Sequence, residues 1–171
     1  LTTYRFYVNM EDATDRMSAV FGNDQSPLEI STPDGAFNSA FNSGWSAPGV
    51  NPAFFVSFPE LVDDSYATIG LDGPASLVPG AADPSLVEDA AQQLSPYFLT
   101  DGATSVVSNT LTGSSWYILN TATNGLPDAD LKVLILQITT SGDLTGTLHY
   151  QVFPLGLGEN AMEVTSSFDA Q

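Results

Sequence analysis

Cysteine is absent from this chain of 171 residues, histidine occurs once, and the only basic side chains are Arg5, Arg16 and Lys132. The lack of cysteine excludes a disulfide framework, a thiolate metal site and a cysteine nucleophile. A single histidine excludes a zinc site built from several histidines, and it leaves one candidate base for a catalytic triad. Composition alone therefore rules out several common kinds of site.

The few basic residues are outnumbered by 20 acidic ones, which gives a formal net charge of −17. Binding to phosphate groups requires clustered Lys or Arg, so we expect neither a nucleic-acid partner nor attraction to an anionic membrane surface. No segment approaches the ~18 apolar residues of a membrane-spanning helix, so no membrane insertion is expected. Repulsion within so acidic a chain indicates a salty or divalent-rich medium or a bound cation, although acidity that only maintains solubility explains the same charge.

The remaining composition is typical of a folded domain with an uncharged polar surface. Hydrophobic residues make up 43% of the chain, whereas charged residues make up only 13%. We find no linker and no internal repeat, so residues 1–171 are predicted to form one domain. The chain begins at Leu1 instead of Met, which we interpret as a processed chain or an excised domain. The scarcity of Lys and Arg leaves few sites for trypsin-like proteases, which favours an extracellular or cell-surface location.

Short runs of alternating apolar and polar residues predict a mostly β protein. Strands are expected at Thr2–Asn9, Pro27–Thr32, Tyr66–Gly70, Ser114–Asn120, Leu131–Thr139, Leu144–Phe153 and Met162–Phe168. Leu131–Thr139 is almost continuously apolar, which predicts a central strand, and Thr140–Asp143 predicts a hairpin turn to the next strand. Ser85–Glu88 has the pattern of a capping box, so one short helix is expected over Ser85–Leu94. This combination indicates an antiparallel β-sandwich or jelly roll.

The single histidine, His149, lies in a segment where apolar Leu148, Tyr150 and Val152 alternate with polar residues. Its side chain is therefore predicted on the exposed polar face of a strand, a poor position for a catalytic base. No Gly-x-Ser-x-Gly motif supplies a nucleophile. A glycosidase with two acids in a cleft is an alternative, but carboxylate number alone carries no specific signal for it. We therefore expect no catalytic site.

Acidic loops are the candidate cation sites, because Ca²⁺ takes roughly six to eight oxygen ligands. The clusters are Glu60 with Asp63 and Asp64, Asp12 with Asp15 beside Asn9 and Glu11, and the pair Asp128 and Asp130. We favour the first as a calcium site, because it lies between Phe58-Pro59 and a strand. None of the clusters matches the EF-hand pattern, and the competing interpretation is a solvated acidic loop. For Asp15, pairing with Arg16 or capping of the next turn is a further alternative.

Residues 36–60 are unusually rich in aromatic side chains set among Asn, Ser, Gly and Pro. Exposed aromatic rings stack on sugar rings or pack on a neighbouring subunit. Phe41 and Trp45 are candidates for such contacts, and so are Trp116 and Tyr117, which are adjacent on a predicted strand so that one should face outward. The other aromatics of the loop are expected to pack inward, and these are Phe54, Phe55 and Phe58.

Several short motifs together resemble a known family. They are Tyr4–Tyr7, Asp15-Arg16, Asn51–Phe55, Phe58–Leu61, Asp64–Gly70, Gly113–Tyr117, Gln137–Thr140 and Tyr150–Phe153. This series, spanning roughly residues 4 to 153, resembles an uncharacterised β-rich domain that occurs, often in tandem repeats, in predicted secreted proteins of marine bacteria and algae. The resemblance implies an extracellular setting and modular use. It transfers no catalytic or binding residues, and this chain contains only one copy.

Two main function classes follow from these observations. The first is a non-catalytic structural subunit that self-assembles into a fibre, sheath or surface layer, with the strands Thr2–Asn9 and Met162–Phe168 as edges that could pair between subunits. The second is a carbohydrate-binding or adhesive module that uses the aromatic loop, with calcium as a candidate cofactor. The expected partner is therefore another copy of the chain, in an oligomer or polymer, or else a glycan.

Overall fold

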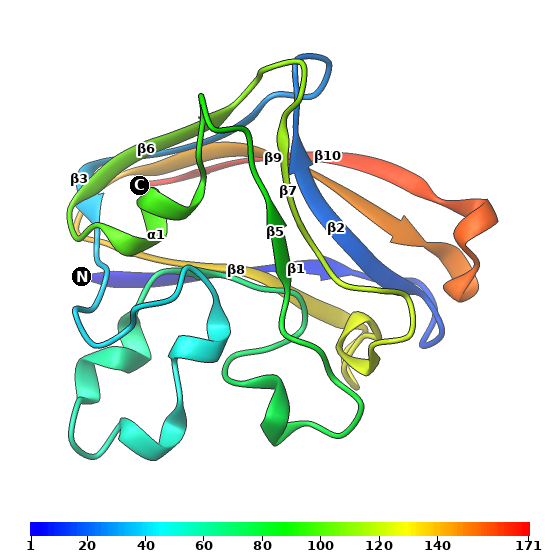
Figure 1. Cartoon of the computed structure of the whole chain (residues 1–171), viewed down its shortest axis with the longest axis horizontal. Coiled ribbons are helices and arrows are strands. Elements are labelled where there is room, and N and C mark those ends of the chain that lie inside the picture. Colours follow the sequence, from blue (N-terminus) through cyan, green and yellow to red (C-terminus); the bar gives the residue numbers. More distant parts are fainter.

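The computed structural model describes residues 1–171, and Figure 1 shows two layers of strands above a layer of loops. The ten strands are β1 (Thr2–Asn9), β2 (Arg16–Gly22), β3 (Leu28–Ala36), β4 (Tyr66–Ala67), β5 (Ser85–Val87), β6 (Ala103–Ser108), β7 (Ser114–Tyr117), β8 (Lys132–Thr140), β9 (Leu144–Phe153) and β10 (Met162–Ala170). The α-helix is α1 (Ser95–Leu99), and the 3-10 helices are η1 (Ala47–Gly49), η2 (Pro52–Phe54), η3 (Pro59–Asp63), η4 (Ala75–Leu77), η5 (Thr123–Gly125), η6 (Pro154–Gly156) and η7 (Gly158–Asn160). The predicted mostly β, antiparallel, sandwich-like fold with one short helix is confirmed.

Strand β8 is the centre of the lower layer in Figure 1, where β1 pairs with it antiparallel and β4 adds a short pairing. The upper layer is built on β9, which pairs with β10 along one edge and with β3 and β2 along the other. β6 extends this layer from β3, and β7 and β5 extend it from β2. The end of β3 crosses to the lower layer, where Ala36 pairs with Thr140.

The predicted hairpin between β8 and β9 is wrong. β3 lies between these two strands in the sheet order, so the segment Ser141–Asp143 passes from one layer to the other instead of turning back along the same sheet. The physical reason is burial, because every residue of β8 after Lys132 is buried. A strand covered on both faces and flanked by β1, β4 and β3 has no free edge for a hairpin partner.

The predicted helix over Ser85–Leu94 is also wrong in position. Ser85–Val87 forms β5, paired with β7, and the α-helix begins only at Ser95. Glu88 explains the shift, because its carboxylate accepts hydrogen bonds from the backbone N–H groups of Leu94 and Ser95 at 2.8 and 3.0 Å and from the Ser95 hydroxyl at 2.7 Å. The acidic residue of the expected capping box thus caps a helix that lies further along the chain.

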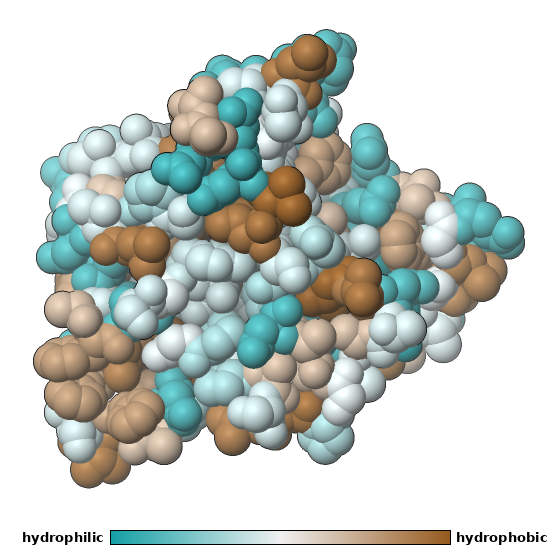
Figure 2. Space-filling model, viewed as in Figure 1, coloured by the Kyte–Doolittle hydropathy of each residue, from teal (hydrophilic) through white to brown (hydrophobic).

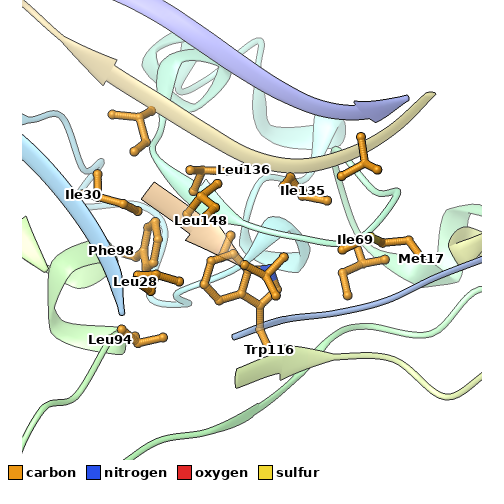
Figure 3. Close-up of a cluster of buried hydrophobic side chains, with 14 of the residues drawn as sticks. Met17, Leu28, Ile30, Ile69, Leu94, Phe98, Trp116, Ile135, Leu136 and Leu148 are labelled. Carbon is orange, nitrogen blue, oxygen red and sulfur yellow. The ribbon is translucent and has the colours of Figure 1, made fainter. Parts of the chain in front are cut away.

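Two apolar cores hold the three layers together. The main core lies between the strand layers and is centred on Trp116, with Met17, Leu28, Ile69, Leu136 and Leu148 around it (Figure 3). A smaller core lies between β8 and the loop layer, and its buried members are Ala47, Val50, Tyr66, Leu71, Ala75 and Leu134. β8 contributes to both cores, which is why its sequence is nearly continuously apolar.

Candidate functional site

The loop layer that covers the outer face of β8 is fixed by one buried carboxylate. Asp64 is fully buried and accepts hydrogen bonds from the Ser39 backbone N–H and from the Asn42 side-chain amide, both at 2.6 Å. Burial raises the pKa of Asp64 to about 6, while the hydrogen bonds from Asn42, Ser39 and Ser65 oppose the rise. Gln137 of β8 donates to the backbone oxygens of Val62 and Asp64, so the layer is held to the sheet at the same point.

This anchored loop presents an apolar surface to solvent. Phe41 and Phe58 are stacked with ring centroids 4.0 Å apart. The same loop also exposes Phe54, Val56 and Val62, and the Val56 side chain is 96% exposed. We call the five residues Phe41, Phe54, Val56, Phe58 and Val62 the Phe41 patch. Figure 2 shows an apolar area at the lower left, where this loop lies in Figure 1.

The backbone beneath the Phe41 patch is well ordered by local hydrogen bonds. Asn51 accepts from the Ala53 N–H at 3.0 Å through its side chain, and the Phe54 carbonyl accepts from Ser57 and Phe58 at 3.0 and 2.8 Å. The patch is therefore a shaped surface with little freedom to fold its rings inward. The prediction that Phe54 packs inward is wrong, since its side chain is 51% exposed, whereas Phe55 and Phe58 are half-buried.

The other predicted aromatic contacts have different surroundings. Trp45 is half-buried against the main core. Trp116 is only 1% exposed and donates from its indole nitrogen to the Thr68 carbonyl at 3.1 Å. It is therefore a core residue, and the prediction that it makes a surface contact is wrong. Tyr117, the next residue of β7, is half-exposed, as the strand alternation predicts. Of the four candidates only Phe41 belongs to the exposed apolar patch.

The acidic residues predicted as calcium ligands lie apart or are engaged by protein donors. Asp63 accepts from the Thr3 hydroxyl at 3.0 Å, whereas Asp64 points inward to Ser39 and Asn42, and Glu60 lies half-buried on η3. No group of three or more His, Asp or Glu side chains converges in a way that could hold a metal ion. The cluster of Glu60, Asp63 and Asp64 is therefore not assembled in this structure.

The second predicted pair organises the loop between β1 and β2. The buried Asp15 carboxylate accepts from the backbone N–H groups of Glu11 and Asp12 and, at 2.8 Å, from that of Leu155. Asp12 is exposed and accepts from both the N–H and the hydroxyl of Thr14, which lowers the pKa of Asp12. Asp15 therefore holds the preceding loop and Leu155 instead of pairing with Arg16 or capping the turn that follows it. Calcium binding stays a prediction.

His149 is buried, which corrects the expectation of an exposed side chain. Its ring nitrogens lie 2.9 Å from the Pro27 carbonyl and 2.9 Å from the Thr165 hydroxyl. Strand alternation placed it on the outer face of β9 correctly, but the neighbouring β10 and the segment before β3 cover that face locally. Both ring nitrogens are thus occupied by structural contacts.

Two strands end the sheet on one side of the molecule. β1 pairs only with β8 and β10 pairs only with β9, so each has one edge without a backbone partner. Across the two layers Phe6 of β1 meets Phe168 of β10, with ring centroids 4.4 Å apart. Further along, the strands diverge around a groove of about 390 Å³ lined by residues of both, among them Val8, Met10, Met162 and Val164.

A second, more polar groove of about 330 Å³ lies at the outer face of β1. It is lined by Arg5 and Lys132, two of the three basic residues of the chain, together with Tyr7, Asp72 and Asp128. Arg5 is within 3.9 Å of Asp72 and donates to Gln137 at 2.7 Å. Sequence reasoning missed this groove, because Asp72 and Lys132 come from distant segments.

Comparison with known proteins gives no relative: no family model matches the chain, and neither a curated protein nor a solved structure matches it significantly. Among the helices, none has the length and apolar character needed to cross a bilayer. The fold and the surfaces described above are therefore the basis for any functional conclusion.

Proposed function

We propose that this protein is a non-catalytic extracellular structural subunit that self-assembles into a fibre, sheath or surface layer. The observation that carries the proposal is the Phe41 patch, an exposed apolar surface on a loop that is fixed from below. Isolated exposed apolar residues are ordinary, but a contiguous set on a rigid frame is typical of an interaction site. Burying it against another copy removes apolar area from water at about 25 cal/mol per Å².

The rigidity of the loop supports the same proposal. Asp64, Asn42 and Gln137 hold the layer through buried hydrogen bonds, so the loop loses little conformational entropy when it docks. A flexible loop with the same side chains would lose much more. Glu60 is the only charged residue among residues 36–62, so contact between two copies of this surface brings few like charges together.

Net charge sets the conditions under which such a subunit assembles. Each copy carries −17, so association brings like charges together unless salt or cations screen them. A salty extracellular medium supplies that screening, which agrees with the location that the sequence predicts and with the resemblance to secreted domains. Calcium ions at the contacts between copies would add to this screening, and calcium binding is part of the same proposal.

A carbohydrate-binding or adhesive module is the second candidate, and the polar groove beside β1 favours it. Arg5, Lys132, Asp72 and the half-exposed Tyr7 offer hydrogen-bond donors and acceptors around one concave surface. Such a mixture of polar groups and one aromatic ring suits a sugar. Binding of oligosaccharides by the wild-type chain, with loss in Lys132→Ala and Tyr7→Ala, would support this candidate.

The self-assembly proposal is tested by electron microscopy and light scattering of the purified chain over a ~100-fold dilution range, with Ca²⁺ or with chelator, because assembly follows mass action. We expect ordered filaments or sheets from the wild type and their loss in the double variant Phe41→Ser/Val56→Ser. Leu111→Ser is the matched control, since Leu111 is 84% exposed but lies outside the patch. A monodisperse monomer in every condition would contradict the proposal.

A further inference from the structure

We infer that the unpaired edges of β1 and β10 join two copies of this chain in a reciprocal dimer, with β1 of each copy pairing antiparallel with β10 of the other. This inference deepens the proposed self-assembly and rests on it, because it names one of the contacts. Its starting point is that both free edges lie on one side of the sandwich, where Phe6 and Phe168 meet.

The middle of β10 lacks the features that normally protect an edge strand. The strand contains no proline or lysine, and its nine residues pair with β9 without a register shift. Between Glu163 and Asp169 its five residues, Val164–Phe168, carry no charge. Natural proteins usually interrupt such an edge with a charge, a proline or a bulge, because an uninterrupted edge adds a further strand readily.

The directions of the two strands define how a second copy fits. β1 and β10 run in opposite directions in the two layers, as Figure 1 shows, and Phe6 lies at the level of Phe168. A two-fold rotation about an axis parallel to these strands places β10 of the second copy beside β1, in the same layer and antiparallel to it. The same rotation creates the identical contact on the other layer, so both free edges of both copies are used.

The register of this arrangement brings opposite charges together. The register applies to Thr2–Phe6, because a bulge interrupts β1 between Phe6 and Tyr7. With Phe6 opposite Phe168 of the second copy, Arg5 lies directly opposite Asp169 of that copy. Both side chains are on outer faces, since their neighbours Phe6 and Phe168 point into the core region. Opposite charges across an antiparallel pair stabilise it. Within its own copy Arg5 already donates through Nε to Gln137 and lies 3.9 Å from Asp72, so Asp169 of the second copy would be a further partner of the same guanidinium group. Asp169 is exposed and free for this contact.

Pairing of β10 with β10 is disfavoured by the same reasoning. Full antiparallel overlap of two β10 strands centres on Ser166 and places Glu163 opposite Asp169 at both ends. Like charges directly opposite each other destabilise a strand pair. The charges on the two edges therefore favour β1 as the partner of β10.

Cysteine cross-linking tests the register, because the natural chain has no cysteine to interfere. Two variants are prepared separately, Arg5→Cys and Asp169→Cys, then mixed and oxidised. We expect a disulfide-linked heterodimer from the mixture and little product from either variant alone, since directly opposite residues have Cβ atoms ~5 Å apart. The control mixture combines Arg5→Cys with Asp24→Cys, which lies in the exposed turn between β2 and β3. It should give no specific disulfide-linked product.

Charge exchange tests the contact energetically by analytical ultracentrifugation. Asp169→Arg places two arginines opposite each other and should weaken the dimer about tenfold or more, because like-charge contacts are costly in an interface. Combining it with Arg5→Asp should restore the wild-type affinity, and the exposed control Asp24→Arg, with the same change in net charge, should not weaken it.

The outcomes separate this inference from the proposed function. Assembly that survives Asp169→Arg unchanged, or a mixture that gives no heterodimer although the wild type assembles, overturns the β1–β10 contact and leaves self-assembly standing. If the wild-type protein stays monomeric in the cross-linking and ultracentrifugation experiments, both the β1–β10 contact and the proposed self-assembly are wrong.

Discussion

The carboxylate of Asp64 and the side-chain amide of Asn42 are joined by a 2.6 Å hydrogen bond inside the protein. Residues 22 positions apart in the chain are thereby tied together, and the Phe41 patch is built on this tie. Burial disfavours the charged form of this carboxylate and raises the pKa of Asp64 to about 6. Stability must therefore depend on its protonation.

We predict that Asp64 makes the protein less stable as pH rises from about 4 to about 6. The folded protein holds this proton up to about pH 6, while the unfolded chain releases it near 3.8, so the folded state binds more protons in that window. The contribution is on the order of 3 kcal/mol. Urea denaturation from pH 4 to 7 gives the free energy of unfolding at each pH. The contribution of Asp64 is the difference between wild type and Asp64→Asn in how this free energy changes with pH.

The exposed neighbour Asp63 provides the control, because Asp63→Asn removes a carboxylate from the same loop without changing a buried group. Its pH profile should follow that of the wild type. If Asp64→Asn gave the wild-type slope as well, the proposed role of the buried carboxylate would be wrong.

Trp116 is expected to be the largest single contributor to the main core. Trp116→Ala should lower the free energy of unfolding by about 3–5 kcal/mol, because it removes a buried ring and leaves the Thr68 carbonyl without its donor. Tyr117→Ala, at the half-exposed neighbouring position, should cost clearly less. Thermal denaturation followed by circular dichroism compares the two, and equal losses would show that the strand alternation is misassigned.

Glu88 is predicted to stabilise the protein through the start of α1. Glu88→Ala removes three hydrogen bonds to Leu94 and Ser95 and should lower stability by about 1–2 kcal/mol. Hydrogen exchange should speed up at the N–H groups of Leu94 and Ser95 in particular. Glu159→Ala, at an exposed position on η7, is the matched change and should leave both measurements near wild type.

Salt is expected to strengthen the association between copies. In the proposed dimer two chains of −17 face each other, and we expect their repulsion to outweigh the attraction of two Arg5–Asp169 pairs, so that screening favours the complex. The dissociation constant measured by ultracentrifugation should fall as NaCl rises from about 20 mM to about 500 mM, that is from a Debye length of about 20 Å to about 4 Å. A rise over the same range would indicate that attractive ion pairs dominate the contact.

The sequence predicts the long strands well and the short ones poorly. Alternation locates β1, and continuous apolar character locates β8 to within a residue at each end, because burial of these strands imposes a period that local sequence reveals. β2, β5 and β6 are not predicted as strands. Ser85–Val87 and Ala103–Ser108 are short and rich in small or polar residues. Their β conformation comes from pairing with β3 and β7, which are distant in the chain.

The candidate site shows the same limit at the level of single residues. The acidic composition around Asp63 and Asp64 suggests exposed ligands, yet Asp64 is buried because Ser39 and Asn42 fold over it. His149 is covered in the same way by Pro27 and Thr165. Burial of a polar side chain depends on distant donors and acceptors, and no periodicity within its own segment reveals them.

The pairing of β1 with β8 also determines when this protein can fold. Thr2 pairs with Thr140 and Asn9 with Lys132, so β1 finds its partner more than 120 residues further along the chain. Such non-local pairing slows folding, because a long loop must close before any contact compensates for its entropy. The lower layer of the sandwich can therefore form only after residues 132–140 are available to pair with β1.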